Sequence, residues 1–130
     1  MTKQDAVAAV ILTASLATWA AMCSAPARAA DTVPFVVSLD RPAVEVPVAF
    51  AKDAGAVIEC ESRWRADAVN PASGAAGLLQ IHPIHRARVE RMGYSWADML
   101  HPAANVRVGL AIWQEQGFAP WSCSPSGGVR

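Results

Sequence analysis

The spacing of apolar residues changes along the chain, and each spacing predicts a different kind of element. From Pro47 onward, apolar residues recur at steps of three and four, which is typical of one face of an α-helix. We therefore expect an amphipathic helix over residues 47–64, with Pro47 in its first turn, where a missing N–H costs nothing. The apolar face of this helix contains Val48, Ala51, Ala54, Val57 and Ile58.

Turn-forming residues interrupt this periodicity after the first helix. Residues 66–77 are dense in asparagine, proline, serine and glycine, and this composition predicts a loop. The short apolar run GLLQI, which ends at Ile81, favours a strand or a buried bend.

Helical patterns dominate the second half of the chain. Residues 83–92 predict a helix that Gly93 ends, and Ser95 with Asp98 has the spacing of a capping box, which predicts a short helical turn. A second long helix is expected over residues 102–116, with the glycine at position 117 as a left-handed cap. The chain is therefore expected to form a small, mainly α-helical single domain.

The longest uncharged run lies at the amino terminus. Residues 6–25 carry no charge, Lys3 precedes them, and Ala27 and Ala29 have the small side chains that signal peptidase accepts. We expect residues 1–29 to be a cleaved signal peptide. The alternatives are an uncleaved membrane anchor, because the run is long enough to span a bilayer, and a buried helix.

The remaining chain divides into three predicted parts. Residues 30–46, rich in proline and valine, are expected to form an extended leader that packs against the body or lies free of it. Residues 47–124 contain the helical domain. Residues 125–130 are expected to be a disordered tail.

Length and charge exclude several classes of function. The chain has 130 residues, which is enough for one domain. Its 11 basic and 11 acidic side chains give no net charge, which argues against nucleic-acid binding, since nucleic-acid-binding proteins normally carry a basic excess and a clustered Lys/Arg patch. Binding to anionic lipid by charge alone is excluded for the same reason, so membrane association is expected only if the signal stays uncleaved.

Three cysteines indicate the compartment. Cys23 lies in the predicted signal, so that the mature chain keeps Cys60 and Cys123. In an oxidising compartment such a pair is expected to form a disulfide, and two free buried thiols are the alternative.

The predicted first helix places one acid on its apolar side. Glu61 lies seven positions after Ala54, close to two full turns, whereas Glu59 faces the opposite side. Burial raises the pKa of a carboxyl group, and a protonated acid is what the cleavage of a glycosidic bond requires. The alternative is an ion pair, for which Arg63, Arg65 and Arg107 are available partners.

Two motifs at a characteristic distance strengthen the first interpretation. The Glu61-Ser62 pair near a helix end, followed by Gly74-Ala75-Ala76-Gly77-Leu78-Leu79-Gln80, resembles the signature of the lytic transglycosylase and goose-type lysozyme superfamily. The resemblance covers roughly residues 48–123. The Cys60-Glu61 pair and the final Gln-Gly-Phe-Ala-Pro-Trp-Ser-Cys stretch are also similar to resuscitation-promoting factors, whose disulfide would correspond to Cys60–Cys123.

The resemblance implies a lysozyme-like domain that acts on peptidoglycan glycan strands. Glu61 would be the general acid and later the base at the β-1,4 bond between N-acetylmuramic acid and N-acetylglucosamine, and the substrate would supply the nucleophile and form a 1,6-anhydro end. Trp121 is a further candidate because aromatic faces stack on sugar rings. The expected substrate-binding residues are Ser62, Ser73, Gly74, Gln80, Ile81, Asn105 and Trp121.

Several of these assignments have structural alternatives. Ser62 would otherwise cap the helix end, and Gln80 would otherwise be a surface residue. Ile81 and Trp121 would otherwise belong to the core, and Asn105 would brace the fold.

Other interpretations of the whole chain remain open. Where soluble lytic transglycosylases usually carry Tyr-Asn-Ala-Gly, this chain has residues 111–114, Ala-Ile-Trp-Gln, so simple hydrolysis is an alternative to anhydro products. A muralytic growth factor and a catalytically inactive peptidoglycan-binding or secretion-accessory module are the others. We expect a monomer that is secreted, periplasmic or associated with the cell wall, with no cofactor and no metal, since His82, His85 and His101 lack a completing ligand.

Overall fold

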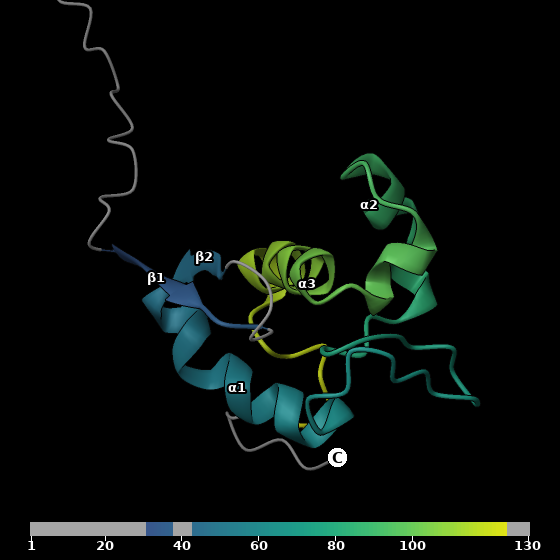
Figure 1. Cartoon of the computed structure of the whole chain (residues 1–130), viewed down its shortest axis with the longest axis horizontal. Helices are drawn as coiled ribbons and strands as arrows, with labels where there is room; N and C mark the ends of the chain where they lie inside the picture. Colours follow the sequence, from purple (N-terminus) through teal and green to yellow (C-terminus); the bar gives the residue numbers. More distant parts are fainter. Residues whose placement is uncertain (1–30, 38–42, 125–130) are drawn as a thin grey trace, which may run out of the picture.

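We describe the fold from a computed structural model, in which residues 31–37 and 43–124 are described. Within these ranges the chain forms three α-helices, two short 3₁₀ helices and one two-stranded sheet (Figure 1). The predicted signal peptide, residues 1–29, and the predicted tail, residues 125–130, lie outside the described residues. In the described part of the chain, no helix combines the length and the apolar character needed to cross a bilayer.

The segment predicted as a leader is part of the domain. Strand β1 (Thr32–Phe35) pairs with β2 (Val44–Pro47) in antiparallel register, with Phe35 opposite Val44. Alternate residues of a strand face the same side, and Val44 and Val46 are buried against α1 and α3. The backbone is extended as expected, but the boundary predicted at residue 47 does not separate the core from a leader.

Helix α1 (Val48–Ser62) begins one residue later than predicted and ends two residues earlier. Pro47 directly precedes it, and Phe50, Ala54, Val57 and Ile58 form its buried face. Arg63 ends the helix in the left-handed conformation, and Trp64 also has a positive φ, of 61°. Neither residue type favours this conformation. The turn places Trp64 against Phe35 of β1, where the two rings stack with centroids 6.3 Å apart. This contact cannot be predicted from the residues around Trp64.

The apolar GLLQI run forms a buried bend rather than a strand. Only single bridges pair Ala76 with Val69 and with Ile81 in this part of the structure. Gly77 has a φ of 79°, and a Cβ added there would collide with the carbonyl oxygen of Met99 and the side-chain amide of Asn105. The bend therefore requires glycine at this position.

The predicted helices of the second half are present with modified ends. The predicted helix over residues 83–92 is split into a 3₁₀ helix and a short α-helix, and the Ser95–Asp98 capping box is formed. Gly117 ends the last helix with a φ of 59° and a ψ of −149°, which is not the left-handed helical cap that was predicted. The elements are η2 (Pro83–His85), α2 (Arg86–Arg91), η3 (Trp96–Leu100) and α3 (Pro102–Gln116).

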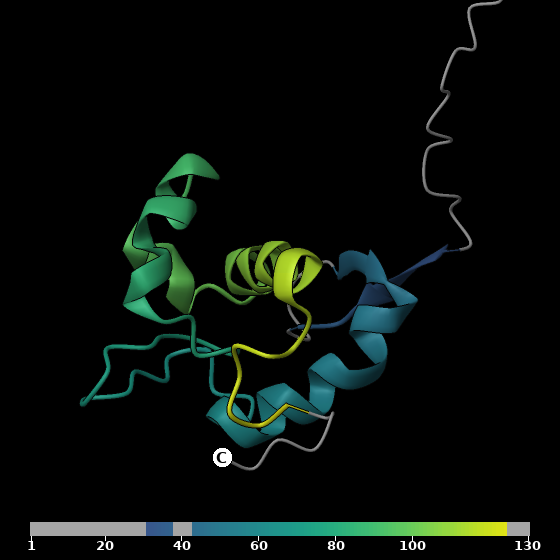
Figure 2. The same cartoon turned by 180° about the vertical axis from the view of Figure 1, so that it is seen from behind.

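The chain returns to α1 after α3. Residues 117–124 run from the end of α3 to the carboxyl-terminal end of α1, as Figure 2 shows from behind. Phe118 stacks on Phe50 of α1, with centroids 5.6 Å apart. A disulfide joins Cys60 to Cys123, whose Cα atoms lie 6.1 Å apart. The predictions of a mainly α single domain and of this disulfide are confirmed.

Candidate active site

An open cleft of about 340 Å³ lies at the carboxyl-terminal end of α1. The last turn of α1, the loop that follows it and Gln80 form its walls. Glu61 is the one acidic side chain among the described residues that line it. The lining residues are Cys60, Glu61, Ser62, Arg63, Arg65, Ala68, Val69, Asn70, Pro71 and Gln80.

Glu61 lies in the last turn of α1 and is half-buried. The prediction of a buried position is only partly right, because the end of the helix emerges into the cleft. Its Oε1 accepts hydrogen bonds from Ser122 Oγ, at 3.2 Å, and from the backbone N–H of Cys123, at 3.4 Å. Glu59 is exposed, as the helical spacing predicted.

The alternative of an arginine ion pair is not found. Within the described ranges, Glu61 forms no salt bridge. Arg63 and Arg65 also line the cleft, but Arg65 pairs with Asp67, at 3.7 Å between Nε and Oδ1. Arg107 is exposed on α3. The carboxyl group of Glu61 is therefore held by neutral donors.

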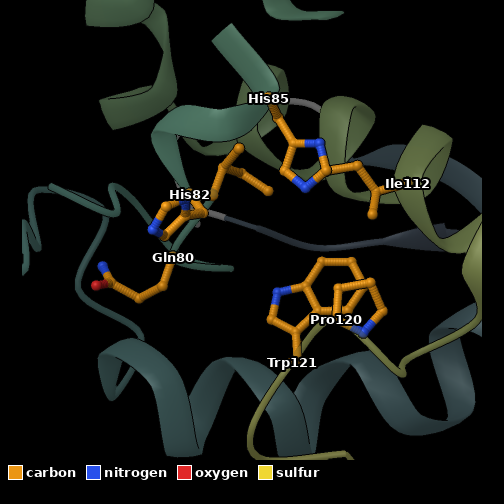
Figure 3. A pocket seen from close by; sticks show the side chains of 7 residues that line it. Gln80, His82, His85, Ile112, Pro120 and Trp121 are labelled. Atoms are coloured by element: carbon orange, nitrogen blue, oxygen red, sulfur yellow. The ribbon is translucent and has the colours of Figure 1, made fainter. Parts of the chain in front are cut away.

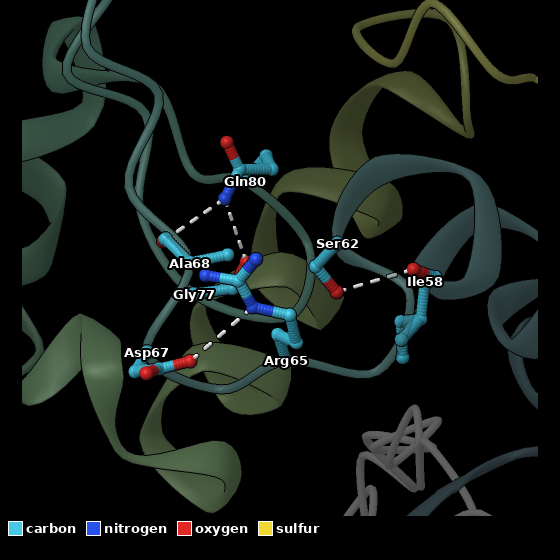
Figure 4. A network of polar contacts seen from close by, with 7 residues as sticks. All are labelled: Ile58, Ser62, Arg65, Asp67, Ala68, Gly77 and Gln80. Carbon is cyan, nitrogen blue, oxygen red and sulfur yellow. Dashed lines mark hydrogen bonds and ion pairs between the residues drawn. The ribbon is translucent and has the colours of Figure 1, made fainter.

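The Ser62 side chain forms a hydrogen bond within α1 and not with the neighbouring Glu61. Its hydroxyl donates to the carbonyl oxygen of Ile58 at 3.1 Å, and the residue is buried (Figure 4). Of the two roles considered for Ser62, the structure contains the one at the helix end. The donors that reach Glu61 come instead from residues 122 and 123. Both belong to the terminal motif that ends at Cys123, but the motif did not indicate that they contact the acid.

The loop that follows α1 presents a different residue from those predicted. Asn70 Oδ1 accepts hydrogen bonds from the backbone N–H groups of Ala72 and Ser73, at 2.9 and 3.2 Å, and Ser73 Oγ accepts one from Ala75 N. These bonds close the loop on itself. Asn70 and Pro71 line the cleft, whereas Ser73 and Gly74 do not. The sequence predicts a turn at Asn70-Pro71 but does not indicate that this pair lines the cleft.

Gln80 connects the loop to the cleft. Its backbone has a φ of 45°, and its Nε2 donates to the carbonyl oxygens of Ala68 and Gly77, at 3.1 and 3.0 Å. The side-chain oxygen points away from both in Figure 4. Because both amide hydrogens are donated, the side-chain oxygen is the group of Gln80 left to bind a ligand, and as an acceptor it suits a hydroxyl or amide N–H of a sugar.

Gln80 also lines a second, smaller pocket of about 40 Å³ (Figure 3). Trp121, predicted to meet substrate, is 6% exposed here, and its Nε1 donates to the carbonyl oxygen of Leu79 at 2.6 Å. Trp121 and Ile81 are core residues that border this pocket and do not line the Glu61 cleft. The pocket is lined by Gln80, Ile81, His82, His85, Ile112, Pro120 and Trp121.

Asn105, another predicted substrate contact, is fully buried in α3. Its Oδ1 accepts from Leu79 N at 2.8 Å, and its Nδ2 donates to the carbonyl oxygens of Ala76 and Met99, at 2.9 and 2.8 Å. Its hydrogen-bonding groups are occupied, and none is accessible to a ligand. Asn105 therefore braces the bend from within the core, which is the structural alternative to substrate binding.

The histidines form no metal site. His85 is half-buried, and burial lowers its pKa; the positive charge of Arg88 and the neighbouring His82 lower it further, while Glu115 opposes them. Among the residues that the structure describes, no three His, Cys, Asp or Glu side chains are grouped so that they could hold a metal ion.

Comparison with known families gives one result. The model of the family described as Transglycosylase SLT domain matches residues 51–120, more than half of the chain. The matched region begins within α1 and includes Glu61, Asn70 and Gln80. No curated protein and no solved structure matches the chain.

Proposed function

This chain belongs to the transglycosylase SLT domain family, and on this premise we propose that Glu61 is the acid with which it cleaves peptidoglycan. Membership gives the chain a lysozyme-like fold and a general peptidoglycan-lytic, transglycosylase-like function. The observation that supports the specific assignment is the half-buried Glu61 in an open cleft of about 340 Å³, whose other described lining residues are not acids. An open cleft suits a polymer, because a glycan strand must extend beyond the bond that is cut.

One acid is sufficient if the substrate supplies the nucleophile. Glu61 gives its proton to the oxygen of the β-1,4 bond as that bond breaks, and the acetamido oxygen of N-acetylmuramic acid attacks C1 to form a cyclic intermediate. The carboxylate then removes the proton of the C6 hydroxyl. The C6 oxygen attacks C1 and breaks the bond between C1 and the acetamido oxygen, so that the acetamido group is restored. The product is a 1,6-anhydro end, and Glu61 regains its proton. Inverting and double-displacement glycosidases instead require a second carboxylate across the cleft.

We place this reaction outside the cytoplasm. Peptidoglycan lies there, and the Cys60–Cys123 disulfide is typical of an oxidising compartment. The predicted signal over residues 1–29 agrees with export.

The test compares two glutamines made at neighbouring positions of one helix. Glu61→Gln keeps the size of the side chain but replaces the carboxyl group with an amide, which cannot donate a proton as a general acid. Glu59→Gln makes the same change on the exposed face of the helix. Insoluble peptidoglycan is incubated with each protein, and both the bound protein and the soluble fragments are measured. Loss of a general acid is expected to slow release at least ~100-fold in Glu61→Gln, with binding retained, and Glu59→Gln is expected to match the wild type.

Two results would reject the assignment. Release by Glu61→Gln at the wild-type rate would mean that another group protonates the leaving oxygen. Binding without release by all three proteins would make the chain an inactive peptidoglycan-binding module.

A further inference from the structure

The orientation of Glu61 depends on residues that follow the last helix. Two consecutive donors, Ser122 Oγ and the backbone N–H of Cys123, meet at the same oxygen, Oε1 of Glu61. Ser62, adjacent to the acid, is occupied by the carbonyl oxygen of Ile58 and is not available for this role. Glu61 and its two donors are separated by about 60 residues of chain, so the contact is a tertiary one.

The donors are anchored on both sides. On one side, Trp121 is buried, and its Nε1 donates to Leu79 O. On the other side, Cys123 is bonded to Cys60, the residue directly before the acid. A donor pair fixed between a core tryptophan and a disulfide loses little conformational freedom when it meets the carboxyl group, which is the condition for a preorganised site.

The convergence on Oε1 distinguishes the two carboxyl oxygens. A protonated carboxyl group carries its hydrogen on one oxygen, and the other acts as acceptor. Oε1 already accepts two N–H or O–H hydrogens, so a proton on it would be opposed by both. Oε2 has no hydrogen-bond partner among the described residues and is the oxygen left to carry the proton.

We propose that Ser122 is a positioning residue for Glu61 and that the Cys60–Cys123 disulfide holds it in place. Ser122 and the Cys123 N–H keep Oε1 as the acceptor, so that Oε2 delivers the proton to the leaving oxygen and later receives the proton of the C6 hydroxyl. This inference rests on the proposed function of Glu61. It assigns a role at the site to Ser122, which the sequence did not single out, and gives the disulfide a part in the site as well as in the fold.

The test separates positioning from binding and from folding. Ser122→Ala removes the hydroxyl, and Ser122→Thr keeps it. Steady-state kcat and KM are measured on soluble glycan strands, with thermal unfolding of each variant. Loss of one hydrogen bond to the acid is expected to lower kcat about tenfold with KM within about twofold, and Ser122→Thr is expected to restore kcat to within about threefold of wild type. Ser122 is exposed, so the unfolding midpoint is expected to stay unchanged in both variants.

The disulfide is tested by the double variant Cys60→Ser/Cys123→Ser, assayed at a temperature at which circular dichroism shows it folded. Its kcat is expected to fall at least as far as that of Ser122→Ala, and adding Ser122→Ala to it is expected to cost less than about twofold more. If the double variant does not fold, the kcat values of Ser122→Ala and Ser122→Thr decide whether Ser122 positions Glu61.

Three outcomes would overturn the proposal: an unchanged kcat in Ser122→Ala, a rise in KM at constant kcat, or a threonine that fails to restore activity. Glu61→Gln is measured in parallel, so that failure of the acid and failure of the positioning are distinguished. If Glu61→Gln is inactive and Ser122→Ala is not impaired, the function stands and the positioning role is rejected. If Glu61→Gln is fully active, the function itself is rejected.

Discussion

At the scale of single residues, Asn105 connects three backbone segments inside the core. Its side chain forms hydrogen bonds with Leu79 N and with the carbonyl oxygens of Ala76 and Met99. All three of these residues are buried, as is Asn105 itself. These bonds hold the bend over residues 77–81, which contains Gln80, one of the cleft residues. The influence of Asn105 on the site is therefore indirect and acts through the position of Gln80.

Replacement of Asn105 by alanine is expected to destabilise the protein by about 3 kcal/mol or more, because three buried polar groups lose their partner at about 1–3 kcal/mol each. Urea unfolding of Asn105→Ala beside the wild type measures this loss. Gln114→Ala, at an exposed position of the same helix, is the control and is expected to unfold with the wild type. A loss below about 1 kcal/mol would show that water or a rearranged backbone replaces these bonds.

Asn105 also illustrates what sequence can indicate about a residue. The family resemblance indicated Asn105, but a polar residue in that helix serves a ligand or a buried backbone group equally well. Glu61 was placed at the site because helical spacing and two motifs agree. Asn70, Ser122 and Cys123 N–H were not, because their contribution arises from loop closure and from a contact across the chain, neither of which has a local pattern.

At the scale of elements, a bidentate ion pair joins α2 to α3. Arg88 donates to both carboxylate oxygens of Glu115, one of them at 2.7 Å. The pair raises the pKa of Arg88 and lowers that of Glu115. His85, at the start of α2, lies within reach of both charges and borders the small pocket.

His85 is expected to make the protein less stable in mild acid. Burial lowers its pKa in the folded state below the usual value of 6.5, so the unfolded chain binds the proton first as the pH falls. Stability is therefore full above pH 6.5 and declines as the pH falls through 6.5 toward the folded-state pKa. Unfolding midpoints from pH 7.5 to 5 are expected to fall less steeply in His85→Gln. Parallel curves for the two proteins would contradict this expectation.

The elements themselves were predicted where local signals are strong. Pro47, the Ser95–Asp98 box and Pro102 mark the beginnings of helices, and each begins there. The end of α1 was not predicted, because Arg63 and Trp64 adopt left-handed conformations that suit the contact of Trp64 with Phe35. The prolines of residues 30–46 indicated an extended leader, and the pairing of β1 with β2 was not predicted.

At the scale of the whole molecule, the disulfide closes the chain around the cleft. Cys60 and Cys123 are 63 residues apart, and the loop between them contains the bend, α2 and α3. The pairing was predictable because two cysteines remain outside the predicted signal. Its proximity to Glu61 followed from sequence, but the hydrogen bonds that it brings to the carboxyl group did not.

Removal of the disulfide in Cys60→Ala/Cys123→Ala is expected to cost about 4 kcal/mol, from the greater entropy of an unfolded chain without a loop of this length. Urea unfolding of this variant and of the wild type, each with and without reductant, measures the difference. Reductant is expected to lower the stability of the wild type alone. Equal stability of the two proteins under oxidising conditions would mean that native-state strain offsets the gain.

We propose that one acid, Glu61, cuts the glycan strand and that the C6 hydroxyl of the substrate forms the 1,6-anhydro end. The most direct measurement is chromatography and mass spectrometry of the fragments that the wild type and Glu61→Gln release from purified peptidoglycan. Fragments from the wild type are predicted to end in 1,6-anhydro-N-acetylmuramic acid, lighter by one water than hydrolysed ends, and Glu61→Gln is predicted to release none. Reducing ends from the wild type, or anhydro fragments from Glu61→Gln, would contradict the claim.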